Sequence, residues 1–87
     1  MTDPLLADLR RQISEIDRSI IEAFNRRLEV VAQIKRHKDE HGLAFVDPDR
    51  EAAMLEQQTS ANRGPLTNEG LRALYAELLA LTKREVG

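Results

Sequence analysis

The chain has 87 residues, of which 13 are basic and 15 acidic, and its net charge of −2 gives no overall field that would attract nucleic acid or an anionic membrane. It contains no Cys, which excludes a disulfide framework, thiolate catalysis and cysteine-ligated zinc. No stretch reaches the roughly 20 apolar residues of a membrane span, and the start at Met1-Thr2-Asp3 lacks the features of a signal peptide, so we expect one cytoplasmic domain over residues 1–87.

The first predicted element is a long helix over residues 4–41. Asp3 and Pro4 form an N-cap followed by proline at the first helical position, and no further Pro or Gly occurs before Gly42. Apolar side chains recur along the helix at alternating spacings of three and four, as in a coiled-coil seam, and Arg27 interrupts them with a charge. The seam comprises Leu6, Leu9, Ile13, Ile16, Ile20, Ala23, Arg27, Val30 and Ile34.

Two shorter helices are predicted to follow, over residues 48–62 and 68–86. Asp47-Pro48 repeats the punctuation of the first helix, and the second helix should stop before Gly64-Pro65. Thr67 is a suitable N-cap for the third helix, whose leucines recur at helical spacing. No alternating strand pattern competes with these helices, so the predicted fold class is all-α, with one long helix and two shorter ones.

The long helix exceeds what a single chain of this size can cover. At about 1.5 Å per residue, the segment from Pro4 to His41 spans roughly 57 Å, which is far more than the width expected of so small a domain. The two shorter helices therefore leave part of the seam exposed. A two-fold homodimer, in which the long helices of two copies pair, is the expected arrangement.

Two cations on one face of the long helix are the first candidate site residues. Arg27 occupies a seam position, where burying a charge is costly unless an anion meets it. Lys38 projects from nearly the same face, about 16 Å further along the helix. A bound anion between them is one interpretation. The alternatives are an intrachain or an interchain ion pair for Arg27, which would set the register, and a helix-dipole contact for Lys38.

Further charged residues lie near the helix starts. Arg10 is about 25 Å from Arg27 along the helix, so it can reach the same small ligand only from the partner chain of an antiparallel dimer. A solvated surface charge is the simpler interpretation of Arg10. Asp47 is the expected cap of the second helix, and Arg50 and Glu51 follow a connector that returns toward the end of the first helix. An ordinary exposed ion pair is the alternative for these two.

His37 and His41 have a spacing that could place two metal ligands on one face of a helix. No third ligand accompanies them, so we expect no metal site and assign both side chains to the C-terminal helix dipole. The Ser and Thr residues lack a His or Asp at an interpretable spacing, and no catalytic nucleophile is predicted.

Four short segments are specific when their spacing is taken together. They are LRRQISEID at 9–17, NRR at 25–27, KRHK at 35–38 and DPDRE at 47–51. Together they resemble the AroQ-class (type II, all-helical) chorismate mutases over essentially the whole chain. The resemblance implies an intertwined homodimer of three-helix chains with two equivalent sites. It also implies an isomerase that converts chorismate to prephenate by a [3,3] rearrangement, without metal or cofactor, in aromatic amino-acid biosynthesis.

The resemblance also implies roles for individual residues. Arg27, with Arg10 from the partner chain, would hold the two carboxylates of chorismate. Lys38 would donate to the ether oxygen of the breaking bond, and Glu51, helped by the backbone near Asp47, would accept from the ring hydroxyl. Lys38, Arg27 and Glu51 are thus the expected catalytic residues. Further expected contacts are Arg50, which would also order the pocket, Thr82 near a carboxylate, and apolar walls from Leu55, Leu78 and Leu79.

One position departs from the family pattern. One turn after Thr82 many members carry Gln or Glu, which also contacts the ether oxygen, whereas this chain has Val86. Val86 is kept among the expected substrate contacts. Either Lys38 acts alone at that oxygen or the terminal turn is rearranged, and the departure favours a weak enzyme stimulated by a partner enzyme of the shikimate pathway.

Three other functions remain open at this point. The same scaffold could release pyruvate from isochorismate, or it could act on 4-amino-4-deoxychorismate. The chain could also be a non-catalytic, dimeric helical interaction module, in which the seam cations pair with acids.

Overall fold

The structure is a computed structural model that describes residues 3–87. Its first helix has a cap at each end. Helix α1 spans Pro4–Glu40, and the carboxylate of Asp3 accepts hydrogen bonds from the backbone N–H groups of Leu5 and Leu6 at 3.0 and 3.1 Å. Its end lies one residue before the predicted end at His41, because His41 is the C-cap. Gly42 follows with a φ of +66°, a conformation that favours glycine.

The two shorter helices are also capped by side chains. Helix α2 spans Pro48–Ala61 and helix α3 spans Asn68–Val86. The Asp47 carboxylate accepts from the Arg50 N–H at 3.1 Å, and the Thr67 hydroxyl accepts from the Gly70 N–H at 3.0 Å. Helix α2 stops before the predicted residue 62, because Asn62 takes an extended conformation and its side-chain amide donates to the carbonyl of Leu66 at 2.8 Å.

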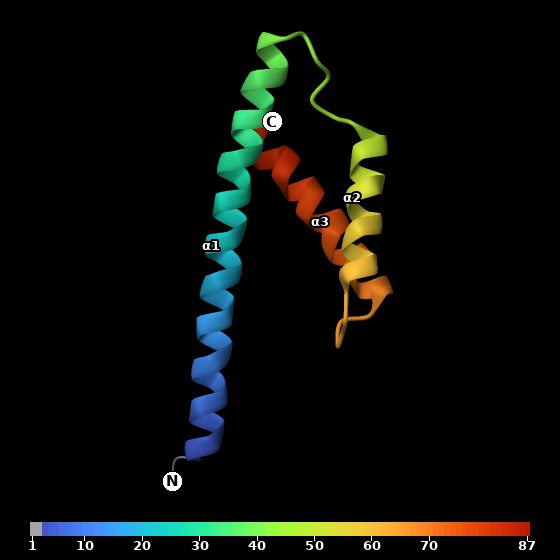
Figure 1. Cartoon of the computed structure of the whole chain (residues 1–87). Helices are drawn as coiled ribbons and strands as arrows, with labels where there is room; N and C mark the ends of the chain where they lie inside the picture. Colours follow the sequence, from blue (N-terminus) through green and yellow to red (C-terminus); the bar gives the residue numbers. More distant parts are fainter. Residues whose placement is uncertain (1–2) are drawn as a thin grey trace.

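The three helices form an open arrangement rather than a closed bundle (Figure 1). Helix α3 packs against both α1 and α2, and the connector at 41–47 joins the far end of α1 to α2. The C-terminal end of α3 meets the second half of α1, while the N-terminal half of α1 extends away from the other two helices (Figure 1). Residues 3–87 contain no strand, so the all-α prediction of one long and two shorter helices is confirmed.

The shape of the chain is too extended for a self-contained domain. Its extents are 62 × 24 × 17 Å, and its radius of gyration is 17.0 Å, compared with roughly 12 Å for a compact domain of this length. The accessible surface is 7241 Å², about 2,000 Å² more than expected for a folded monomer of this mass. In the part of the chain that the structure describes, Tyr75 and Thr82 are the two buried residues.

The predicted seam of α1 accounts for much of this excess surface. Most of its apolar side chains are exposed in the single chain, and none of the α1 residues is buried. The exposed apolar residues of α1 are Leu5, Leu6, Leu9, Ile13, Ile16, Ile20, Ile21, Val30 and Ile34. Exposed apolar surface of this extent is typical of protein–protein interfaces. Among residues 3–87, no helix is both long enough and apolar enough to cross a membrane.

Candidate active site

A cleft of about 390 Å³ lies where the second half of α1, the start of α2 and the end of α3 meet. Its size falls in the range of about 300–1,000 Å³ that is typical of small-molecule sites. The lining combines charged groups with apolar walls. The residues that line it are Arg27, Val31, Ile34, Lys38, Phe45, Val46, Asp47, Arg50, Glu51, Met54, Leu79, Thr82 and Lys83.

Arg27 is held in place by α3. Its guanidinium Nη1 donates to the hydroxyl of Thr82 at 2.7 Å, and that hydroxyl donates its own proton to the carbonyl of Leu78 at 2.6 Å. Thr82 is only 5% exposed. Because the hydroxyl proton is used by Leu78, the oxygen presents a lone pair to Arg27 and fixes the direction of the guanidinium. The remaining guanidinium N–H groups are available for a ligand.

Lys38 is oriented by the connector between α1 and α2. Its ammonium Nζ donates to the backbone carbonyl of Phe45 at 3.2 Å, and both residues are half-buried in the cleft wall. The ion pairs within residues 3–87 involve neither Lys38 nor Arg27. An intrachain ion pair, one of the two alternatives for Arg27, is therefore wrong, and the cleft presents two cations without carboxylate partners.

The α2 side of the cleft carries the acidic groups. Glu51 is half-buried, and its Oε1 lies 3.1 Å from the Nζ of Lys83 on α3. The alternative in which Arg50 and Glu51 pair with each other is wrong, since Glu51 pairs with Lys83 and Arg50 is exposed at the cleft edge. Asp47 lines the cleft while its carboxylate caps α2, as the sequence predicts.

Six of the eight predicted site residues come together in this cleft, and Arg10 and Val86 do not. Val86 is the last residue of α3, and it lies one helical turn, about 5.4 Å, beyond Thr82 along the helix axis. Val86 is not among the residues that line the cleft, and its contact with the substrate stays a prediction. The terminal turn is regular helix through Val86, and the rearranged turn considered from the sequence is absent.

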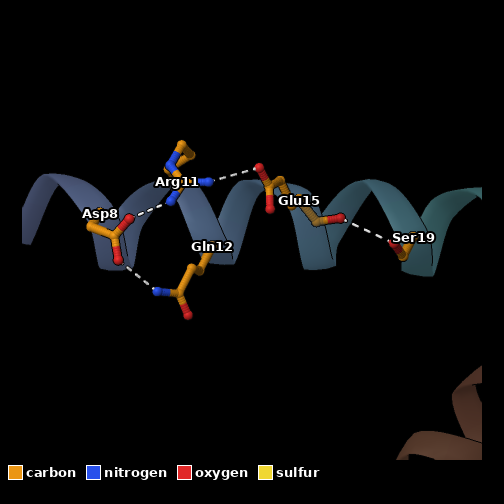
Figure 2. Close-up of polar contacts among 5 residues, drawn as sticks. All are labelled: Asp8, Arg11, Gln12, Glu15 and Ser19. Carbon is orange, nitrogen blue, oxygen red and sulfur yellow. Dashed lines mark hydrogen bonds and ion pairs between the residues drawn. The ribbon is translucent and has the colours of Figure 1, made fainter.

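Arg10 lies in the half of α1 that extends away from α2 and α3, consistent with a role only in a partner's cleft. Figure 2 shows how its neighbour differs: Arg11 is held within its own helix by Asp8 and by Glu15, whose Oε1 lies 3.1 Å from Nη1. Arg10 has no ion pair in the described part of the chain. It lies about 40° from Leu6 around the helix, against about 140° for Arg11, so Arg10 flanks the seam.

The apolar walls differ in part from the prediction. Leu79 lines the cleft, but Leu55 and Leu78 do not, and Met54 takes the wall position on α2. Sequence reasoning also missed several lining residues. They are Val31, Ile34, Phe45, Val46, Met54 and Lys83. Ile34 could have been found from its place on the same stripe as Arg27 and Lys38, whereas no sequence signal marks Lys83.

Other surface features are weaker candidates for a functional site. A hollow of about 580 Å³ is lined by Ala53, Glu56, Gln57, Ser60 and Ala61, which all belong to α2, so no groups converge on it from another element. The rings of His37 and His41 lie 4.2 Å apart, and Nδ1 of His41 is 2.8 Å from the carbonyl oxygen of His37. Residues 3–87 contain no cluster of three or more His, Cys, Asp or Glu side chains suited to a metal ion.

Comparison with known proteins relates the whole cleft to one family. A family model described as chorismate mutase type II matches residues 9–86. The T-protein of Haemophilus influenzae is 47% identical over 51 residues, which are 59% of this chain and 14% of that protein. The bifunctional chorismate mutase/prephenate dehydratase of Pseudomonas aeruginosa is 29% identical over 80 residues, which are 86% of this chain and 22% of that protein. The chain thus spans a minor part of the length of these relatives.

Solved structures extend the similarity to the fold. Form I of chorismate mutase from Thermus thermophilus is 32% identical, with a TM-score of 0.87 over 88% of this chain and 96% of that chain. Form II of the same enzyme is also 32% identical, with a TM-score of 0.88 over 91% of this chain and 90% of that chain. The family model covers nearly every residue that forms the three helices and the cleft, and the chain belongs to the type II chorismate mutase family.

Proposed function

We propose that this chain converts chorismate to prephenate, without a cofactor, in a cleft that a second copy of the chain completes. The charge content of the cleft is the observation that carries this proposal. Four cations and two carboxylates line it, which leaves two positive charges in excess and suits a dicarboxylate substrate. The cations are Arg27, Lys38, Arg50 and Lys83, and the carboxylates are Asp47 and Glu51.

Arg27 is the proposed anchor for one carboxylate of the substrate. A guanidinium can bind a carboxylate through two parallel N–H bonds, which fixes both position and direction. Thr82 occupies Nη1 of Arg27 at 2.7 Å and so aligns the remaining donors. In the proposed dimer, Arg10 of the partner chain binds the second carboxylate, because its own chain leaves it about 25 Å from Arg27.

Lys38 is the proposed catalytic cation. In the rearrangement the ether C–O bond breaks while a new C–C bond forms between the enolpyruvyl methylene and the ring, and electron pairs shift around a six-membered array without proton transfer. Negative charge grows on the ether oxygen as its bond to the ring lengthens. An ammonium held at that oxygen stabilises the transition state more than the ground state, and this preference lowers the barrier.

The rest of the cleft restricts the substrate to the reactive shape. The enolpyruvyl side chain must fold over the ring in a chair-like pose, and holding it there removes an entropic part of the barrier. Apolar side chains such as Val31, Phe45 and Leu79 provide walls for this purpose. Glu51 is the proposed acceptor for the ring hydroxyl, which sets how the ring lies between the two anchored carboxylates.

The proposed dimer follows from the uncovered surface of α1. The chain exposes about 2,000 Å² more than a compact monomer of its mass, and its seam of Leu and Ile residues is exposed. Pairing two such surfaces would give an interface in the range of obligate homodimers. A two-fold axis then creates two equivalent clefts, each with Arg10 from the other chain.

Two related substrates and one partner need separate tests. Side-by-side turnover of chorismate, isochorismate and 4-amino-4-deoxychorismate identifies the preferred substrate, and we expect chorismate.

We also propose that a partner enzyme of the shikimate pathway stimulates the reaction, because Val86 leaves Lys38 without a second donor from its own chain. This proposal is supported by one relative that joins chorismate mutase and prephenate dehydratase in one protein. Stimulation is measured as kcat/KM with and without the added enzyme.

The decisive experiment is a chorismate-to-prephenate assay with chromatographic separation of the product. We expect turnover by the wild type, and losses of about 100-fold or more for Lys38→Ala and Arg27→Ala. Arg36→Ala removes an exposed cation of α1 outside the cleft and is the matched control. Turnover of the wild type no faster than the buffer would refute the proposal.

The same variants separate an enzyme from an interaction module. If Arg27 serves a substrate, Arg27→Ala keeps the dimer and the melting temperature while it loses turnover. A large fall in the melting temperature, with dissociation of the dimer, would instead favour a structural role for Arg27 across the seam.

A further inference from the structure

Lys83 makes the one ion pair of residues 3–87 that joins two helices. Its Nζ lies 3.1 Å from Oε1 of Glu51, so the pair connects the end of α3 to the first turn of α2. The other ion pairs join residues three or four apart within α1. Both members of the pair line the cleft. The Lys83–Glu51 pair thus links two helices at the site, whereas the other pairs each stay within one helix.

We propose that Lys83 positions Glu51 and selects a ring hydroxyl over a ring ammonium in the substrate, an inference that rests on the proposed function. A carboxylate accepts hydrogen bonds at both oxygens. Lys83 occupies Oε1 of Glu51 and leaves Oε2 for the substrate. The bond also limits the rotamers of a flexible glutamate side chain, so the free oxygen is held in one direction before the substrate arrives.

The location of Lys83 on α3 gives this pair a further consequence. Lys83 follows Thr82, and successive helical residues point about 100° apart. Thr82 bonds to Arg27 on α1, and Lys83 pairs with Glu51 on α2. A single turn of α3 therefore sets the separation between the arginine proposed for a substrate carboxylate and the glutamate proposed for the ring hydroxyl.

The positive charge of Lys83 is the physical reason for the proposed preference for a ring hydroxyl over a ring ammonium. A second cation placed beside Glu51 meets the repulsion of the Lys83 ammonium, whereas a neutral hydroxyl does not. The substrate 4-amino-4-deoxychorismate, with its ring amine in the ammonium form, is therefore disfavoured relative to chorismate. A neutral side chain at position 83 removes the repulsion and narrows the difference between the two substrates.

The exposure of the Lys83–Glu51 pair allows an effect on substrate selectivity to be separated from an effect on folding stability. The side chains of Lys83 and Glu51 are 43% and 28% exposed, and such a solvated pair contributes little to folding stability. Removing Lys83 should therefore leave the melting temperature close to that of the wild type. A change in substrate selectivity without a change in stability is then an effect on the site.

The experiment measures kcat and KM of the dimeric protein for both substrates. For Lys83→Gln we expect kcat/KM for chorismate to fall about threefold to tenfold, and the preference for chorismate over the amino substrate to fall by a similar factor. Lys83→Arg, which keeps a cationic donor, should retain most of both. Arg84→Gln removes the adjacent exposed cation outside the cleft and should behave as the wild type.

A variant at Glu51 distinguishes positioning from direct action. In a Glu51→Gln background, Lys83→Gln should cause little further loss, because the carboxylate that Lys83 holds is gone. The same loss in both backgrounds would overturn the inference, and so would an unchanged substrate preference in Lys83→Gln. Absence of wild-type turnover overturns the proposed function and this inference with it, whereas wild-type turnover with an unchanged preference overturns this inference alone.

Discussion

Arg27 and Thr82, 55 residues apart in the sequence, are joined by a 2.7 Å hydrogen bond from the guanidinium to the hydroxyl. The bond lies at the crossing of α1 and α3, and the hydroxyl is itself held by the carbonyl of Leu78 at 2.6 Å. A buried threonine at this crossing thus determines the direction of the arginine that we propose binds a substrate carboxylate. One contact therefore both connects α1 to α3 and orients the site.

We expect Thr82→Val to lower kcat/KM for chorismate about tenfold, since a hydrogen bond from a charged donor is lost while the side-chain shape is kept. Thr82→Ser retains the hydroxyl and should stay within about threefold of the wild type. Steady-state kinetics, with circular dichroism as a check of helix content, measures both. Equal activity of the Val and Ser variants would show that the hydroxyl does not orient Arg27.

Arg10 and Arg11 form a matched pair for testing the shared site. Arg10→Ala should lose about 100-fold or more in kcat/KM, because a substrate carboxylate loses its charged partner. Arg11→Ala should change kcat/KM little, since Arg11 is held by Asp8 and Glu15 on the exposed face of its own helix. Comparable losses for both variants would contradict a specific role for Arg10.

Mixing inactive variants tests whether the site is built from two chains. Arg10→Ala and Arg27→Ala should each be inactive as homodimers. After unfolding and refolding together in equal amounts, mixed dimers contain one intact site, and about a quarter of the wild-type activity should return. Activity that stays at the level of the separate variants would mean that Arg10 and Arg27 do not serve one site from different chains.

The exposed seam predicts obligate dimerisation. Ile16 is 57% exposed in the single chain, and Ile16→Glu places a charge in the proposed interface, so we expect the dimer dissociation constant to rise by at least about 100-fold. Analytical ultracentrifugation measures this, and the wild-type melting temperature should rise with protein concentration. Arg18→Glu, on the opposite face of α1, is the control and should remain dimeric.

Gly42 follows the C-cap of α1 and belongs to the connector that orients Lys38. Its φ of +66° disfavours other residues, and the N–H of Leu43 donates to the carbonyl of Lys38 at 2.8 Å in the same turn. Gly42→Ala should lower the free energy of unfolding by about 1 kcal/mol, since nothing lies within 4 Å of the added Cβ and backbone strain is the sole cost. Gly42→Asn should cost less, because Asn tolerates this conformation better. Urea denaturation distinguishes the two.

Much of the fold was predictable because its signals are local. Asp3, Asp47 and Thr67 were predicted as caps from the residues beside them, and each accepts the expected backbone hydrogen bond. The helices α1 and α2 end within one residue of the expected ends near 41 and 62, and the difference arises because His41 and Asn62 are caps whose conformation depends on the turn that follows. The exposed seam followed from periodicity and helix length alone.

The candidate site was predictable where the sequence places charges on a recognisable face. Arg27 and Lys38 share one stripe of α1, and the next helix begins with Asp47, Arg50 and Glu51. The two groups meet in the cleft because the connector folds back from the end of α1. Lys83 was missed, and Val86, which was expected as a substrate contact, is not among the residues that line the cleft. Both lie on α3, and their places depend on where along its length α3 crosses the other two helices.

The sequence by itself determined the three helices, their caps, the exposed seam and the chemical types of most site residues, because these depend on interactions within about one helical turn. Only the tertiary structure decided that Thr82 orients Arg27, that Lys83 pairs with Glu51, and that Met54 rather than Leu55 lines the cleft. Those contacts depend on the crossing of α3 with α1 and α2, which is set by side-chain packing summed over whole helix faces rather than by any short segment.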